Sequence, residues 1–350
     1  MMEDKMHIVD ADAHVLECEA TWSYLSRAEA SFEPVVVKAT TKSGAEEEFW
    51  LMDGLVQPKS QNMGIDTPRE SRELTDVDAR LRHMDQLGVD IQVIYPTVFL
   101  RPFTRRAEVE IALYRSYNRW LADVWKAGKD RIRWVVLLPL LSMDKALSEL
   151  RWAKENGACG VFMRGLEADK HLCDSYFFPL YEEAANLDLA ICIHSGNGSF
   201  PMHDYYVNET SFSKFKLLNV AAFNTLIFNG IPDLFPKLRF AFVESGAQWV
   251  PYAVHDLARR IERQRGNPKG KLKKNFLADN RFFVTCQTDD DLAYILQYSG
   301  DDSLVIGTDY GHSDVSAEID ALKTLRHLPG VSAGVADKIL SENARKLYGL

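Results

Sequence analysis

The sequence lacks the features that mark several classes of protein. Its five cysteines among 350 residues are scattered, odd in number and without Cys-x-x-Cys spacing, so a reducing cytoplasm is the simplest location. No apolar run approaches the roughly 18 residues of a membrane span, and no apolar signal segment precedes the first predicted strand. Acidic residues outnumber basic ones by 50 to 41, and no arginine-rich stripe offsets the net charge of −9. These absences argue against membrane insertion and nucleic-acid binding.

Short apolar runs alternate with segments of helical length along most of the chain. The runs are β-branched and almost continuously apolar, which is typical of strands that are covered on both faces. Eight strands joined by helices predict an α/β fold, a (β/α)8 TIM barrel with an insertion after strand 1. A doubly wound open sheet is the alternative, but it would not naturally place several ligands around one mouth. The predicted strands cover residues 8–12, 91–95, 132–138, 158–163, 189–194, 238–244, 281–286 and 303–309.

Two stretches interrupt this alternation. Residues 18–74 are too long for a loop and are predicted to form an inserted arm or lid, with a small hairpin from 34–37 and 48–52. Residues 195–212 are rich in glycine and aromatics and are expected to shape a substrate pocket as a loop. Residues 1–350 are otherwise predicted to be a single barrel domain.

Polar residues with metal-binding side chains follow four of the predicted strands directly. A carboxylate or imidazole after a buried strand costs free energy unless it binds something. Because the carboxyl ends of parallel strands share one edge, these side chains predict one metal site at the barrel mouth. The candidate ligands are Asp12 and His14, His194, Glu244, and Asp309 with His312.

The candidates differ in the roles open to them. Asp12 and His14 are two residues apart on a strand and point to the same face, as a clamp on one ion requires. Asp309 could ligate the ion and accept a proton from bound water. His312 could bind metal, contact substrate or orient Asp309. Glu244 could be a general base, a ligand to a second ion, or a helix cap.

Several further residues near the predicted mouth are weaker candidates. Arg164 ends the fourth strand, where its guanidinium could grip a substrate carboxylate or form a structural ion pair. His203 lies in the glycine-rich segment and is a substrate-binding candidate, as is Arg101 after the second strand. Glu17 is explained as well by a salt bridge at the rim as by ligation.

These motifs resemble those of the amidohydrolase superfamily. Within it, they resemble most the group that contains aminocarboxymuconate-semialdehyde decarboxylase and the dihydroxybenzoate decarboxylases. The resemblance implies a (β/α)8 barrel that holds a divalent ion, often zinc or manganese, on Asp12, His14, His194 and Asp309. It also makes a homodimer the expected assembly. The matching segments are residues 9–17, 82–90, Ile193-His194, 242–251 and Gly-Thr-Asp-Tyr-Gly-His at 307–312.

Three positions depart from the pattern of the family. Asp12 stands where the superfamily usually has the first histidine of His-x-His. Strand four ends in Met163-Arg164 and lacks the lysine that often bridges two ions, which opposes a dihydroorotase-like binuclear hydrolase. Glu244 replaces the histidine that related decarboxylases carry after strand six, so their route of proton transfer is in doubt.

Three functions remain open on the sequence. The first is a metal-dependent hydrolase or decarboxylase of a small carboxylated or aromatic acid, and Glu244 favours hydrolysis slightly. The second is a dinuclear iron, or iron and manganese, oxygenase that uses the extra carboxylate and hydroxylates a small substrate. The third is a non-catalytic barrel subunit, but every ligand position implied by the resemblance holds a competent residue.

Overall fold

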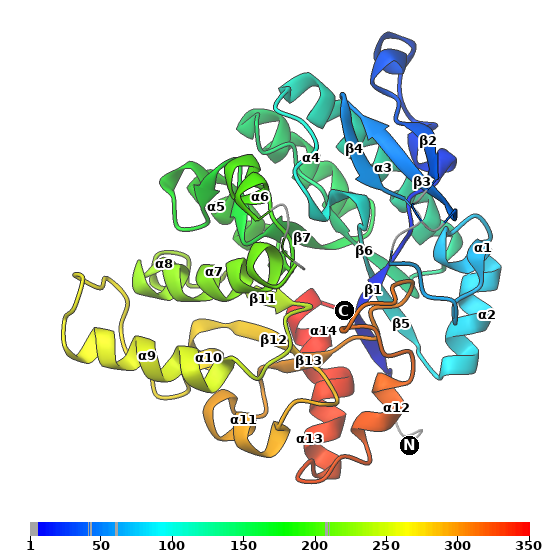
Figure 1. Cartoon of the computed structure of the whole chain (residues 1–350). Helices are drawn as coiled ribbons and strands as arrows, with labels where there is room; N and C mark the ends of the chain where they lie inside the picture. Colours follow the sequence, from blue (N-terminus) through cyan, green and yellow to red (C-terminus); the bar gives the residue numbers. More distant parts are fainter. Residues whose placement is uncertain (1–5, 41, 43, 60–61, 207–208, 210) are drawn as a thin grey trace.

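The computed structural model describes residues 6–40, 42, 44–59, 62–206, 209 and 211–350. Eight parallel strands form one sheet, and the expected barrel is confirmed (Figure 1). Every residue of these eight strands except Ile91 and Arg133 is buried, as the apolar runs predict. In spatial order the strands are β1 (Val9–His14), β5 (Ile91–Tyr95), β6 (Ile132–Val136), β7 (Ala158–Arg164), β10 (Ala190–His194), β11 (Phe240–Val243), β12 (Phe282–Cys286) and β13 (Leu304–Ile306).

The barrel closes where β13 returns to β1. The amide of His14 donates to the carbonyl of Tyr310 at 2.9 Å, and the amide of Asp309 donates to the carbonyl of Asp12 at 2.9 Å. Gly307 permits this approach, since a Cβ there would lie 2.3 Å from the Cβ of Asp12. The seam therefore brings the residues after the last strand against the end of the first.

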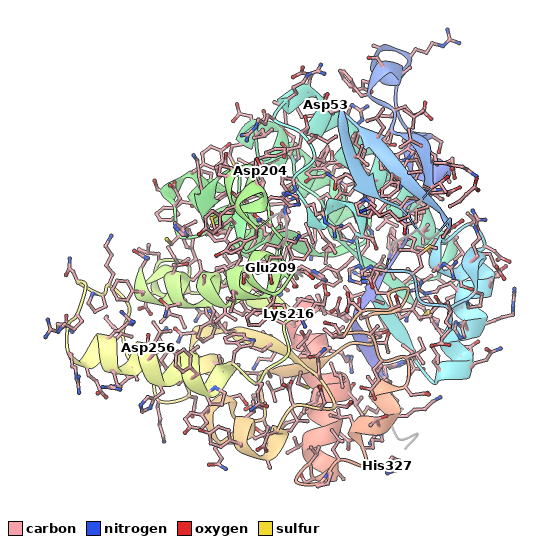
Figure 2. All side chains as sticks on the ribbon, in the orientation of Figure 1. Asp53, Asp204, Glu209, Lys216, Asp256 and His327 are labelled. Atoms are coloured by element: carbon pink, nitrogen blue, oxygen red, sulfur yellow. The ribbon has the colours of Figure 1, made fainter. Side chains whose placement is uncertain are left out.

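Helices surround the sheet, and side chains fill the space between the strands (Figures 1 and 2). The helices are α1 (Arg69–Arg72), α2 (Val77–Leu87), α3 (Ala107–Ala127), α4 (Met143–Glu155), α5 (Phe178–Asn186), α6 (Phe200–Tyr205), α7 (Leu217–Phe228), α8 (Ile231–Leu234), α9 (Val250–Glu262), α10 (Phe276–Asn280), α11 (Leu292–Ser299), α12 (Ala321–Leu325), α13 (Ala333–Asp337) and α14 (Asn343–Tyr348). Short 3-10 or π segments are η1 (Glu19–Trp22), η2 (Arg27–Phe32), η3 (Val98–Leu100), η4 (Ser175–Phe177), η5 (Phe212–Lys216) and η6 (Lys338–Glu342). Among the described residues, no helix is both long and apolar enough to cross a membrane.

The insertion after β1 carries the expected hairpin together with a third strand that the sequence pattern did not reveal. Its strands β2 (Val35–Thr40), β3 (Glu46–Met52) and β4 (Leu55–Pro58) form an antiparallel sheet. The segment reaches the barrel mouth, where the amide of Gly64 donates to the carbonyl of Gly311 at 2.8 Å. The insertion therefore lies against the loop that follows β13.

The segment 195–212 differs from the expected loop, because residues Phe200–Tyr205 form helix α6. Pro201 lies in the first turn of α6, where the missing amide hydrogen of proline costs no helical hydrogen bond. Residues 207–208 and 210 of the predicted loop lie outside the described residues. A two-stranded ribbon, β8 (Leu166–Glu167) and β9 (Lys170–His171), follows β7.

Candidate metal centre

The polar residues at the strand ends come together at the mouth of the barrel. Asp12 and His14 end β1, His194 ends β10, and Glu244 and Asp309 follow β11 and β13. All five side chains are buried. The structure thus places together the residues that the sequence placed at four separate strand ends.

The two histidines direct unprotonated nitrogens at each other. His14 Nδ1 lies 3.0 Å from the carbonyl oxygen of Pro96, and His194 Nδ1 lies 3.0 Å from that of Ser195. Because a carbonyl oxygen only accepts hydrogen bonds, each Nδ1 carries the hydrogen and each Nε2 carries a lone pair. The two Nε2 atoms are 3.2 Å apart. Two lone pairs at this distance repel each other unless a cation lies between them.

Two carboxylates approach the same nitrogens. Asp12 Oδ1 lies 3.3 Å from His194 Nε2, and Asp309 Oδ1 lies 3.3 Å from His14 Nε2. Both oxygens of Asp309 are buried without a hydrogen-bond partner among the described residues, and burial raises the pKa of this carboxyl well above its usual range. Imidazoles bound to one ion at about 2.1 Å and roughly at right angles stand about 3 Å apart. Asp12, His14 and His194 therefore offer one close set of ligand atoms for a divalent ion, and His14, Asp309 and His312 offer a second set that shares His14.

Backbone strain marks the two carboxylates that follow strands. Glu244 has φ 61° and Asp309 has φ 52°, both in the left-handed region that favours glycine. A residue with a Cβ in this conformation costs roughly 1–2 kcal/mol. The amide of Glu244 is held by the hydroxyl of Thr285 at 2.8 Å. Such strain concentrates at functional sites, where the surrounding structure fixes it.

Glu244 stands beside the histidine pair and belongs to a second acidic group. Its Oε2 lies 3.2 Å from His194 Nδ1 and has no hydrogen-bond partner among the described residues. Burial raises the pKa of Glu244 well above its usual range, and the neighbouring carboxylate of Asp309 adds to that rise. Glu244, Asp309 and Asp314 each offer an oxygen within 4.8 Å of the others. This side chain is therefore placed either to hold a proton or to ligate a second ion.

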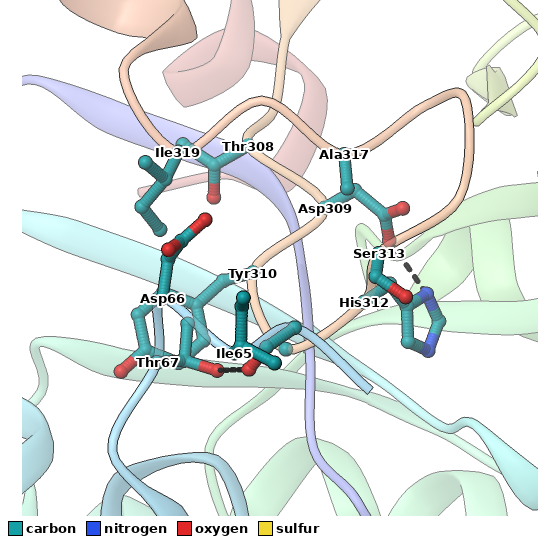
Figure 3. Close-up of a pocket in the computed structure, with 12 residues that line it drawn as sticks. Ile65, Asp66, Thr67, Thr308, Asp309, Tyr310, His312, Ser313, Ala317 and Ile319 are labelled. Carbon is teal, nitrogen blue, oxygen red and sulfur yellow. Dashed lines mark hydrogen bonds and ion pairs between the residues drawn. The ribbon is translucent and has the colours of Figure 1, made fainter. Parts of the chain in front are cut away.

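His312 is fixed by the segment that follows β5. Its Nδ1 lies 2.7 Å from Asp309 Oδ1, the contact drawn in Figure 3, and its Nε2 lies 2.9 Å from the hydroxyl oxygen of Thr97. The Thr97 hydroxyl donates to the carbonyl of Val15 at 2.8 Å, so it accepts from Nε2. Nδ1 then faces Asp309 with a lone pair, which suits a ligand or a partner of the bound ion. Glu17 holds the same segment by accepting the amide hydrogen of Thr97 at 3.0 Å.

The guanidinium of Arg164 forms its hydrogen bonds with other groups of the protein. Its Nε and Nη2 donate to the two carboxylate oxygens of Glu167 at 2.8 and 2.6 Å. Its Nη1 donates to the carbonyls of Phe99 and Arg101, both at 3.1 Å. This is the geometry of the structural ion pair considered for it, and the guanidinium fork faces Glu167.

Removing Glu167 should destabilise the protein strongly. Glu167→Ala leaves the guanidinium of Arg164 buried without its counter-charge, so we expect a loss of about 3–5 kcal/mol in the free energy of unfolding, measured by urea denaturation. Asp320→Ala, which removes an exposed pair with Lys323, is the matched control and should change it by less than about 1 kcal/mol. Equal losses in the two variants would show that Arg164 has no need of Glu167.

A cavity of about 870 Å³ opens beside the metal-binding residues. Thr97, Ser195, Glu244 and Asp314 are among its lining residues. Its other lining residues include two aromatic side chains from η5, two basic residues and part of the insertion, namely Phe212, Phe215, Arg101, Lys216, Pro58 and Asn62. His203 lies on α6 with its imidazole a quarter exposed, and it is not among the lining residues. The cavity therefore offers aromatic walls with both basic and acidic side chains next to the metal site.

Several of these residues were not predicted from the sequence. Thr97 and Asp314 lie on connecting segments and Lys216 ends the short π segment η5, and no periodic pattern marks any of them. The only available signal for Asp314 was its position two residues after His312.

Comparison with known proteins identifies the family whose metal-binding pattern the site resembles. The amidohydrolase family model matches residues 9–350. The chain belongs to the amidohydrolase family. The superfamily resemblance drawn from the sequence is thereby confirmed, and so is the assignment of the metal-binding barrel to a family of enzymes.

Three relatives of this amidohydrolase show how far the likeness extends. The 2-amino-3-carboxymuconate-6-semialdehyde decarboxylase of Dictyostelium discoideum is 22% identical over 288 residues, which cover 79% of this chain and 77% of the relative. An amidohydrolase structure from Mycobacterium avium subsp. paratuberculosis matches with a TM-score of 0.77 at 18% identity, over 99% of this chain and 100% of the other. A dihydroxybenzoic acid decarboxylase from a Polaromonas species, solved with bound manganese and the inhibitor 2-nitroresorcinol, matches with a TM-score of 0.70 at 19% identity, over 99% and 97%. At these identities the solved structures establish the fold.

Proposed function

We propose that this amidohydrolase is a manganese-dependent decarboxylase of a small aromatic carboxylic acid. The observation that carries the proposal is the convergence of the His14 and His194 lone pairs with two carboxylates at the end of a cavity with aromatic walls and basic residues. The names of the relatives favour decarboxylation over the hydrolysis that the sequence slightly favoured. Manganese suits a mixed set of imidazole and carboxylate ligands, and the Polaromonas enzyme binds it.

In this proposal each side chain has a separate task. Asp12, His14, His194 and Asp309 would hold the ion, and His312, whose Nδ1 faces Asp309 with a lone pair, would add a further ligand. When bound, the ion supplies positive charge that polarises the substrate's oxygens. Glu244 lines the cavity and would hold a proton on Oε2. That proton goes to the ring carbon as its bond to the carboxylate breaks and the bonding electron pair stays on the ring, so that one carboxylate anion and one proton give one arene and CO₂.

The test uses protein that has been purified without chelator and loaded with manganese. With 2,6-dihydroxybenzoate and related ortho-hydroxybenzoic acids, we expect CO₂ release that EDTA abolishes and manganese restores. In D₂O the product should carry one deuterium at the carbon that lost its carboxylate. Intact acids together with hydrolysis of lactones or amides would instead identify a hydrolase.

A dinuclear oxygenase is the second candidate. It is favoured by the acidic group of Glu244, Asp309 and Asp314, which could hold a second ion beside the first. About two ions per chain including iron, with oxygen uptake in place of CO₂ release, would support it. A non-catalytic barrel would show neither activity.

We also retain the prediction of a homodimer. Large aromatic side chains such as Tyr252 and Tyr294 are 77% and 42% exposed, and they offer surface for a second copy. We further propose that the inserted segment acts as a lid, because its residues Pro58 and Asn62 line the cavity.

A further inference from the structure

One surface segment carries a concentration of positive charge that the metal site does not use. Residues 259–274, from the last turns of α9 to the residue before the N-cap of α10, contain eight basic residues and one acidic residue, Glu262. The net charge of the whole chain is −9, so the rest of the molecule is more acidic than that figure indicates. None of these residues is among the described residues that line the large cavity. The segment lies at the outer edge of the molecule, away from the strands of the barrel (Figure 1).

Most of these basic side chains have no internal counter-charge. Arg260 pairs with Asp256 at 2.5 Å, and Lys273 pairs with Asp233 at 2.8 Å. The other six are exposed, and within the described part of the chain none of them has a carboxylate oxygen within 4.0 Å: Arg259, Arg263, Arg265, Lys269, Lys271 and Lys274. Like charges so close together repel one another, and an external anion relieves that repulsion.

The fold holds the middle of this segment in place. The amides of Lys269 and Gly270 both donate to the carbonyl of Phe228 at the end of α7, at 2.9 and 3.2 Å. A Cβ at Gly270 would lie 1.9 Å from the carbonyl oxygen of Ile227, so the close approach to α7 requires glycine. The basic side chains are therefore presented from a backbone that is fixed against α7.

The helix dipoles account for only part of this charge. Arg259 and Arg260 lie in the last turn of α9, where the helix dipole favours cations. Lys273 and Lys274, in contrast, directly precede Asn275, the N-cap of α10, where the dipole disfavours cations. The dipoles therefore explain the arginines at the end of α9 but do not explain the lysines.

Exposed leucines lie among these cations. Leu272 stands between two lysines and is 46% exposed, and Leu234 is 57% exposed and follows Asp233, the partner of Lys273. Cations around exposed apolar side chains are typical of surfaces that rest on anionic lipid, because the cations meet the headgroups while the apolar groups enter the boundary with the acyl chains. A nucleic acid would leave the leucines in water, and residues 259–274 include no aromatic side chain on which bases could stack.

We propose that residues 259–274, together with Leu234, form a docking surface for an anionic phospholipid membrane. Binding is peripheral and reversible, and it needs no membrane-spanning helix. The cations are attracted to the lipid headgroups, while Leu272 and Leu234 bury apolar area at the interface. The attraction acts within the Debye length, about 8 Å at physiological ionic strength, so the acidic remainder of the molecule opposes it only weakly. This inference is independent of the reaction at the metal centre.

The test uses the whole chain and two kinds of vesicle, one of pure phosphatidylcholine and one that also contains about 30% phosphatidylserine. In flotation assays the wild type should bind only the anionic vesicles, and about 0.5 M salt should release it. The triple variant Lys269→Gln/Lys271→Gln/Lys274→Gln should bind about 100-fold more weakly, because each cation contributes about fivefold. Leu272→Ser should weaken binding about tenfold without any change in charge.

The control removes the same amount of charge elsewhere. The triple variant Lys129→Gln/Lys145→Gln/Lys154→Gln replaces three exposed lysines outside the segment and should bind the anionic vesicles as wild type does. Every variant should keep the metal content of the wild type, which shows that the barrel is folded.

Three results would overturn the proposal. The first is a wild type that binds both kinds of vesicle equally or binds neither. The second is tighter binding to double-stranded DNA than to vesicles, unaffected by Leu272→Ser, which would assign the segment to a nucleic acid. The third is salt-sensitive self-association without vesicle binding, lost in the first triple variant, which would assign the segment to a second copy of this chain.

Discussion

Replacing His194 with alanine should abolish tight metal binding and activity while the barrel stays folded. The Nε2 of His194 faces that of His14 at 3.2 Å, and Asp12 Oδ1 lies 3.3 Å away, so the change removes one nitrogen from the centre of the group. Catalysis would fall to background because the ion that polarises the substrate is no longer retained. Metal content by elemental analysis and activity on the same sample measure both effects.

The control for this variant is a histidine outside the site. His171→Ala, at an exposed position in β9, should keep the wild-type metal content and activity. Circular dichroism melting separates loss of metal from loss of fold, since His194→Ala leaves the apolar residues of β10 in place. Unchanged metal content in His194→Ala would remove this residue from the site. In that case the 3.2 Å contact between the two imidazoles would need a different explanation.

The barrel was predictable because its strands are buried on both faces. Runs such as 189–194 and 238–244 are apolar at nearly every position, and this pattern leaves few alternatives to a strand covered by helices. The ligands were predictable for a related reason. His194 and Asp309 follow such runs immediately, and a polar residue at the rim of a core has few roles other than binding.

The remaining parts of the site depend on distances that a sequence pattern does not contain. Arg164 has Glu167 three residues away, yet only the ribbon of β8 and β9 shows that the two side chains meet. The role of Thr97 comes from one hydroxyl that links Val15 to His312, which follow neighbouring strands of the barrel. Contacts of this kind arise from the packing of loops.

Glu244→Gln should separate the two leading mechanisms. Glutamine has nearly the shape of glutamate and can keep the left-handed backbone at φ 61°, so the loop after β11 should be preserved. If Glu244 delivers the proton, the variant should keep one ion per chain and lose about 10²–10⁴-fold in kcat, because an amide has no transferable proton. KM should change little, because the proton transfer is made in the chemical step and glutamine occupies the same space.

The metal content of the same variant tests the alternative role. If wild-type protein holds two ions, loss of one in Glu244→Gln identifies the side chain as a ligand, together with Asp309 and Asp314. Glu262→Gln, at the exposed end of α9, is the control for removal of a negative charge and should alter neither metal content nor kcat. Full activity with one ion in Glu244→Gln would contradict both roles. The proton would then have to come from another group of the metal centre, and Asp309, whose burial raises its pKa, would be the first to replace.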